Sequence, residues 1–151
     1  MTAIDIRRGL IRLLRDNTDV PHITGEEIEA VKDYHTLAGD GDEKVLPTFQ
    51  VNVQPVSGKA AAAGYHMKKS VFVDISYMEA RYTSRKALQE RLEELQGILL
   101  PVLMIGNRAF SPVLSFGITD GIGHCTFPLE WTDTVPFEEE EPPAEKIEIR
   151  L

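Results

Sequence analysis

Cysteine is almost absent from this sequence, and its scarcity limits the kinds of site that the chain can hold. Cys125 is the single cysteine among 151 residues. One thiol cannot form a disulfide within the chain, and it cannot supply the four ligands of an all-cysteine zinc centre. The sequence therefore suits a reducing cytoplasm, and it predicts neither a disulfide framework nor a four-cysteine metal site.

Long apolar runs and an excess of positive charge are also missing. No stretch reaches the roughly 18 uninterrupted apolar residues of a membrane-spanning helix, and the arginine-rich N-terminal segment lacks the small-residue cleavage site of a signal peptide. The chain has 16 Lys and Arg against 24 Asp and Glu, a net charge of −8. From the missing apolar runs we expect a soluble protein with no membrane partner. Because the negative charge repels a phosphate backbone, we expect no sequence-directed DNA binding.

Signatures of catalysis are lacking as well. No HExxH, HxH or CxxC motif occurs, and the glycine-containing stretches match neither a phosphate loop nor a dinucleotide fingerprint. Cys125 is predicted on the apolar face of a strand, where a thiol behaves as a small hydrophobe. His124 points to the opposite face of that strand, so the two cannot form a nucleophile and base pair. We therefore expect no enzyme activity, no metal and no cofactor.

Apolar periodicity predicts two helices. The first covers residues 3–16, with Thr2 as its N-cap and apolar residues at helical spacing: Ile6, Leu10, Leu13 and Leu14. The second begins after Thr83 or Ser84, ends near Gly97 and Pro101, and repeats Leu88, Leu92, Leu95 and Leu99 on one face.

Three arginines lie on another face of the first predicted helix: Arg8, Arg12 and Arg15. The simpler interpretation, which we prefer, is a solvated helix surface. The alternative is a docking face for an acidic neighbouring subunit.

Alternating apolar and polar residues predict two antiparallel strands, at 46–56 and 68–78. Between them, residues 57–64 contain nothing larger than alanine except Lys59, so this segment is interpreted as a mobile loop. Lys59 is its one charged residue and a candidate partner contact. A short extended piece is also predicted after Pro21.

Asp120-Gly121 is the clearest local signal, since both residues suit the positive φ of a type I′ hairpin turn. This turn pairs Thr119 with Ile122 and Phe116 with Cys125. It puts seven apolar residues on one face: Leu114, Phe116, Ile118, Cys125, Phe127, Leu129 and Trp131.

The element order predicts an α+β fold, with a single antiparallel or mixed sheet and two helices packed on one face. Residues 1–134 are expected to form one domain. Residues 135–151 are acidic and interrupted by prolines, and they end in Ile147, Ile149 and Leu151 alternating with charged residues. We interpret them as an extended C-terminal arm that either lends a strand to a neighbour or folds back on its own sheet.

Several strings in this order resemble the tail-terminator, or tail-completion, family of long-tailed bacteriophages. They are GEEIE at 25–29, TFQVNVQPV, VFVDISYMEARYTSRKALQERLEELQGIL, the Asp-Gly hairpin and the terminal EKIEIRL. The resemblance covers nearly the whole chain. It departs from the family pattern at an insertion of about 15 residues after GEEIE that contains GDGDE, which leaves strand boundaries between 25 and 47 undetermined.

The resemblance implies a virion protein of the phage tail, assembled in the host bacterial cytoplasm. Such a protein forms a ring, commonly a hexamer, on the tail tube, stops its polymerisation and presents a surface for head joining. Its partners would be copies of itself, the tail-tube protein and a head-completion or neck protein, with DNA passing through the ring without specific binding.

Two alternatives remain beside the tail terminator. One is a neck or head-completion protein, which is also a small ring former. The other is an α+β domain that binds a small molecule or peptide on the sheet face near Ser115, His124 and Thr126.

Overall fold

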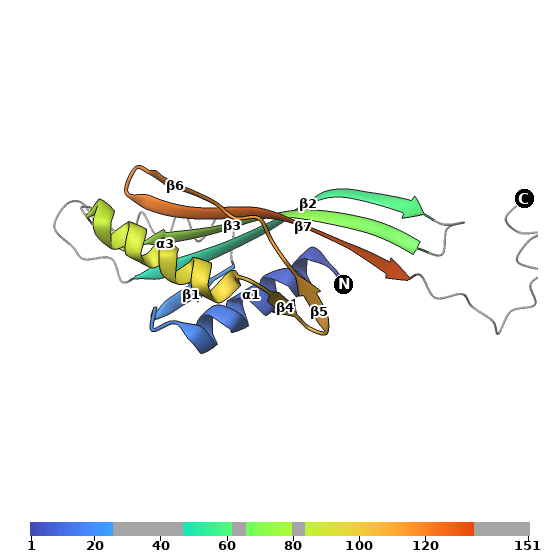
Figure 1. Ribbon diagram of the computed structural model, residues 1–151, viewed down its shortest axis with the longest axis horizontal. Helices are drawn as coiled ribbons and strands as arrows, with labels where there is room; N and C mark the ends of the chain where they lie inside the picture. Colours follow the sequence, from blue (N-terminus) through green and yellow to red (C-terminus); the bar gives the residue numbers. More distant parts are fainter. Residues whose placement is uncertain (26–46, 62–65, 80–83, 135–151) are drawn as a thin grey trace, which may run out of the picture.

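The computed structural model describes residues 1–25, 47–61, 66–79 and 84–134 (Figure 1). The predictions for 26–46 and for the C-terminal arm, including Ile147, Ile149 and Leu151, fall outside these residues. Along the chain the elements are α1 (Ala3–Asn17), β1 (His22–Thr24), β2 (Thr48–Ala61), β3 (His66–Met78), α3 (Arg85–Leu99), β4 (Leu103–Ile105), β5 (Arg108–Phe110), β6 (Ser115–Thr119) and β7 (Ile122–Thr134). The predicted α+β class is confirmed.

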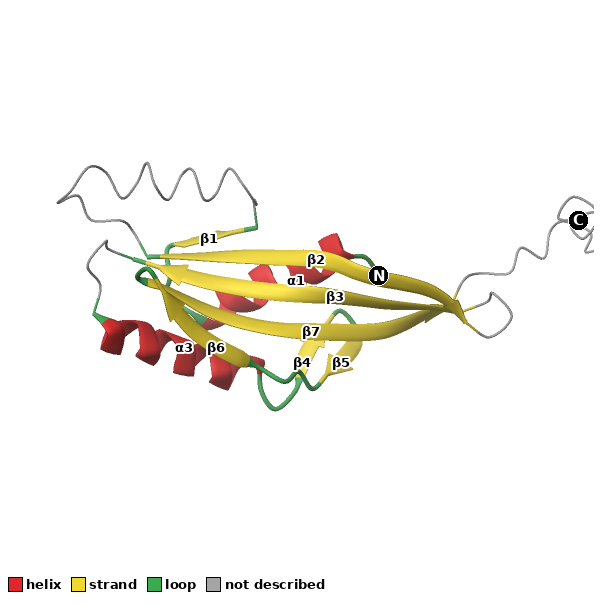
Figure 2. Ribbon diagram, turned by 90° about the horizontal axis from the view of Figure 1, so that it is seen from above, coloured by secondary structure: helices red, strands yellow, loops and turns green. Residues whose placement is uncertain are grey.

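One five-stranded sheet has the strand order β1-β2-β3-β7-β6. The β1–β2 pair is parallel and the other pairs are antiparallel, so the sheet is mixed. Both helices lie on the same face of this sheet, as predicted (Figures 1 and 2). A separate two-stranded hairpin, β4–β5, was not predicted, and each of its strands has only three residues.

The helices have the caps and apolar faces that the sequence predicts. Thr2 and Asp5 form a capping box at α1, and Ser84 caps α3 by accepting a hydrogen bond from the Ala87 amide. Gly97 lies within α3 rather than at its end, because the helix continues to Leu99. The buried helix residues are Ile6, Leu10, Leu14, Leu88, Leu92, Leu95 and Leu99.

The β6–β7 hairpin has the predicted turn and register. Asp120 and Gly121 have φ of 52° and 76°, and Thr119 pairs with Ile122. Four of the seven residues predicted on its core face are fully buried: Cys125, Phe127, Leu129 and Trp131. Phe116 is an exception: its side chain remains 42% exposed, because β6 is an edge strand of the sheet.

The predicted loop at 57–64 is wrong for residues 57–61, and residues 62–64 lie outside the described ranges. β2 continues to Ala61, and its residues 57–61 pair with 66–70 of β3. Side-chain burial is not needed there, because the backbone ladder itself holds the segment, helped by a 2.6 Å hydrogen bond between the hydroxyls of Ser57 and Ser70. The register shifts between Pro55 and Ser57, the signature of a β-bulge.

The far ends of β2, β3 and β7 together extend past the N-terminal end of α1 (Figures 1 and 2). We call residues 57–61, 66–70 and 130–134 the distal arm. The arm is tied to the rest of the molecule by the Asp133 carboxylate, which contacts the Met1 ammonium at 3.0 Å, Lys69 Nζ at 3.0 Å and Arg108 at 2.8 Å. The Trp131 indole donates a further hydrogen bond to it at 3.1 Å. Four separate segments are thus joined at one carboxylate.

Candidate functional site

The arginines of α1 are exposed, as the helical spacing predicts. Arg8, Arg12 and Arg15 all have solvent-accessible side chains. None of them forms an ion pair within the described ranges. The structure thus places the three arginines on one accessible surface. It does not distinguish a solvated helix surface from a docking face.

The distal arm carries an unusual pair of lysines. Lys59 on β2 and Lys68 on β3 are directly opposed in the register, and both are exposed. They share a face with Ser57 and Ser70, whose hydroxyls bond to each other, and this is the sheet face away from the helices. Like charges placed directly across a strand pair repel each other, so this arrangement weakens the isolated hairpin.

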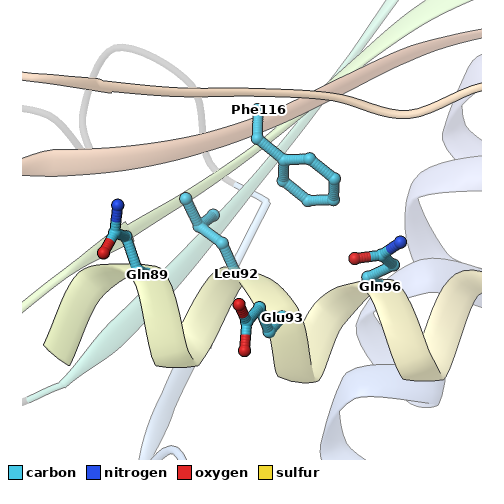
Figure 3. Close-up of a pocket in the computed structure, with 5 residues that line it drawn as sticks. All are labelled: Gln89, Leu92, Glu93, Gln96 and Phe116. Carbon is cyan, nitrogen blue, oxygen red and sulfur yellow. The ribbon is translucent and has the colours of Figure 1, made fainter. Parts of the chain in front are cut away.

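A groove runs between α3 and the edge strand β6 (Figure 3). It has a volume of about 330 Å³ and is lined by Gln89, Leu92, Glu93, Gln96 and Phe116. Figure 3 shows Phe116 reaching from β6 toward α3, and Leu92 rising from the helix between the two glutamines. The floor is therefore apolar and the rim on α3 is polar, with Glu93 as the charged group among the lining residues.

The constellation closest to a catalytic site lies on the open face of the sheet. Asp74, Ser76 and His124 come together from β3 and β7, with His124 Nδ1 3.2 Å from the Asp74 carboxylate and 3.1 Å from Ser76 Oγ. The Ser76 hydroxyl also donates to Asp74 at 3.2 Å. In a catalytic triad the serine and the carboxylate bond to opposite nitrogens of the histidine, whereas here both meet Nδ1. The imidazole therefore cannot pass a proton between them in the triad manner.

Cys125 is fully buried on the other face, as predicted. Burial, together with the negative charge of Asp74, raises the pKa of its thiol to about 12. Since the thiolate is the reactive form, this cysteine is inert at neutral pH. Within the described ranges, no group of three or more His, Cys, Asp or Glu side chains is arranged to hold a metal ion. Of the helices in these ranges, none combines the length and the apolar character that crossing a lipid bilayer requires.

His124 makes a pH-dependent contribution to stability that can be measured. The hydrogen bond with Asp74 raises the pKa of His124 above its ordinary value and outweighs burial, which lowers it. Stability from a raised histidine pKa is present below about pH 6.5 and is lost as the pH rises through the folded-state pKa. We expect His124→Gln to lower the free energy of unfolding by up to ~1 kcal/mol at pH 5.5 and by less at pH 8.5.

Urea unfolding of both proteins at the two pH values measures this difference. His66→Gln is the matched control, because His66 has no ion pair in the described part of the chain. An equal loss for His124→Gln at both pH values would contradict the assigned interaction.

The sequence drew attention to Lys59 but missed Lys68, Glu93 and Phe116 as surface features. The lysine pair becomes visible only when the hairpin register is known, because a predicted loop has no cross-strand partner. Phe116 was placed correctly by face but not by exposure, since periodicity does not reveal which strand lies at the edge.

Comparison with known proteins gives one family. A family model described as phage tail terminator protein matches residues 5–141. Among solved structures, the sheath/tube terminator of an extracellular contractile injection system, PVC, seen by cryo-EM in its extended state, is similar over 94% of this chain and 62% of that chain. The identity is 9% and the TM-score 0.41, and this chain spans less than two thirds of that terminator's length. No curated protein matches.

Proposed function

The chain belongs to the phage tail terminator protein family, and from this premise we propose that it forms a ring on the end of a tail tube, stops the polymerisation of the tube and provides the surface for head joining. The observation that carries the proposal is the family match over residues 5–141, which includes every described element except the first two residues of α1. This family is a structural class and not a class of enzymes.

The surface of the molecule supports self-association. Exposed side chains of opposite charge lie on separate elements. The distal arm carries lysines, and the apolar groove at α3 has a glutamate at its rim. A contact between two different surfaces of identical copies repeats around an axis, and it closes into a ring when the rotation between neighbours divides a full turn. We propose a hexamer, as is common in this family.

We propose further that the completed ring lies in the virion tail, assembles in the host cytoplasm and lets DNA pass without binding it specifically. The net charge of −8 supports weak affinity for the phosphate backbone. The tail-tube protein and a head-completion or neck protein are the proposed partners.

Three sets of residues remain proposed contacts. They are the α1 surface of Arg8, Arg12 and Arg15, the lysine Lys59, and the C-terminal arm with Ile147, Ile149 and Leu151. For the C-terminal arm, strand donation to a neighbour and pairing with its own sheet are both retained.

The alternative of a small-molecule or peptide site near Ser115, His124 and Thr126 has less support. In the part of the chain that the structure describes, three grooves lie along α3, at the base of the distal arm and beside β5, and none of these three is lined by Ser115, His124 or Thr126. A neck or head-completion protein would share the ring but not the binding to tube ends.

The test measures mass by light scattering over a concentration series, with and without purified tail tubes, followed by negative-stain imaging. Rings, or density that caps one end of each tube, are expected. A protein that remains monomeric and ignores tubes would contradict termination and favour the binding domain, whereas rings that never attach to tubes would favour a neck protein.

A further inference from the structure

We propose that Lys59 and Lys68 on the distal arm of one copy dock in the α3–β6 groove of a second copy, against Glu93 and Phe116, and that this contact repeats around the ring. The inference rests on the proposed function, since it assumes that copies of the chain associate. The inference goes beyond the proposed function by naming the two surfaces that meet.

The lysine pair presents two adjacent positive charges to an external partner. Lys59 and Lys68 oppose each other across the β2–β3 ladder, and neither forms an ion pair within the described ranges. Two ammonium groups held side by side at the end of an exposed hairpin repel each other unless an anion lies between them. A carboxylate from another molecule would turn this repulsion into attraction.

The groove offers a carboxylate of this kind beside an aromatic ring. Glu93 lines the groove and, unlike Glu90 and Glu94 on the same helix, has no ion-pair partner in the described part of the chain. Phe116 is 42% exposed at the same place. The groove therefore presents apolar surface and a free carboxylate side by side to a partner.

Lysine fits both features of the groove at once. Its aliphatic stem packs on apolar surface while its ammonium reaches outward, and an ammonium within about 6 Å of an aromatic ring centre gains cation–π attraction. The lysine stems would bury the apolar surface of Leu92 and Phe116, and the ammonium groups would form ion pairs with Glu93.

The two surfaces cannot meet within one copy. Leu92 packs against Gly123, where an added Cβ would lie 3.4 Å from its side chain, and Gly123 is opposite Tyr77 on β3. Tyr77 is nine residues from Lys68 along the same strand, or about 30 Å at ~3.3 Å per residue. The distal arm lies toward one end of the molecule, and α3 and β6, whose residues line the groove, lie toward the other end in both views (Figures 1 and 2). Their contact is therefore between copies and joins two different surfaces, as a ring requires.

Charge reversal tests the contact. Lys68→Glu and Glu93→Lys should each abolish ring formation in light scattering, because the first removes the net positive charge of the lysine pair and the second places ammonium groups on both sides. An equimolar mixture of the two variants should form rings again. In an alternating ring, the introduced carboxylate at position 68 of one variant meets the introduced ammonium at position 93 of the other, and the native Lys68 meets the native Glu93. The double variant Lys68→Glu/Glu93→Lys restores an opposite-charge pair at positions 68 and 93 of every contact, and it should form rings on its own.

Lys86→Glu and Glu90→Lys are the matched controls. They change the net charge by the same amounts, but neither residue lines the groove or belongs to the distal arm. Both control variants should form rings as the unmodified chain does.

Covalent trapping provides a second, independent readout. Lys68→Cys/Glu93→Cys should give, under mild oxidation, a ladder of disulfide-linked oligomers on a non-reducing gel. The native Cys125 does not compete, because it is buried and its pKa is raised to about 12. The single variants should give no product larger than a dimer.

The outcomes separate this inference from the proposed function. If the unmodified chain forms rings that survive both charge reversals and the paired cysteines give no ladder, the docking is wrong and ring formation stands. If the unmodified chain never associates, with or without tubes, both are overturned. If Lys68→Glu leaves rings intact but weakens retention on immobilised double-stranded DNA, the lysines face nucleic acid and the docking is again wrong.

Discussion

Phe127→Ala is expected to lower the free energy of unfolding by about 3–5 kcal/mol, the range for removing a buried phenylalanine. Phe127 is 1% exposed in the middle of β7, where it pairs with Val73 on the central strand. The loss combines the transfer free energy of the ring with the cavity left between the sheet and the helices. Since a domain of this kind is stable by only about 5–15 kcal/mol, the variant should be close to unfolding at moderate temperature.

Urea unfolding followed by tryptophan fluorescence measures this change, because Trp131 is the single tryptophan and is buried. Thr126→Ala is the matched control: it is the preceding residue of the same strand, on the open face of the sheet, and should change stability far less. Equal losses for the two variants would show that the core does not lie on the helix side of β7.

Asp133→Asn is expected to lower the free energy of unfolding by about 2 kcal/mol at pH 7. The substitution keeps the shape of the side chain but leaves the Met1 ammonium, Lys69 and Arg108 without their shared counter-charge. Removing one partner of a buried ion pair costs about 3–5 kcal/mol, and exposed pairs contribute about 0–1 kcal/mol. With the Asp133 side chain 17% exposed, an intermediate value applies.

The pH dependence identifies the cause of that loss. Burial raises the pKa of Asp133, but hydrogen bonds from the N-terminal ammonium, Lys69 and Trp131 outweigh burial and hold the pKa well below its usual range. A depressed carboxylate pKa contributes stability above the unfolded value of about 3.9, and this stability is lost as the pH falls through the folded-state pKa. The difference between the unmodified chain and Asp133→Asn should therefore be constant from pH 5 to 7 and shrink below about pH 4.

Guanidinium or urea unfolding at pH 7, 5 and 3 tests this dependence. Asp120→Asn is the control, because asparagine is equally suited to the positive φ of a type I′ turn and Asp120 is exposed. A difference for Asp133→Asn that persists unchanged at pH 3 would mean that packing, and not charge, accounts for the effect.

Local sequence signals were sufficient to predict α1, α3 and the β6–β7 hairpin. Thr2 and Ser84 cap the helices because their hydroxyls accept from amides a few residues away, an interaction that needs no tertiary context. Asp120 and Gly121 define a turn for the same reason. Residues a few positions apart interact independently of the rest of the fold, so these caps and turns can be predicted from the sequence.

The proposed contact surfaces were only partly predictable. The exposure of Arg8, Arg12 and Arg15 follows from the helical period, whereas the position of Lys59 was assigned to a loop that is in fact strand. A strand stabilised by its backbone ladder, and not by side-chain burial, leaves no alternation in the sequence. The extension of β2 beyond its bulge was therefore invisible from the residues alone.

The α+β class, the helix caps, the core-facing residues and the Asp-Gly hairpin follow from the residues alone, because each depends on short-range spacing or on the conformational preference of one or two residues. The three-dimensional arrangement was needed to show that Phe116 lies at an open edge, that Lys59 opposes Lys68, and that Asp133 contacts positive groups from the N-terminus, β3 and β5. These features arise from strand order and register. Both are set by the packing of segments far apart in the chain, on which local periodicity carries no information.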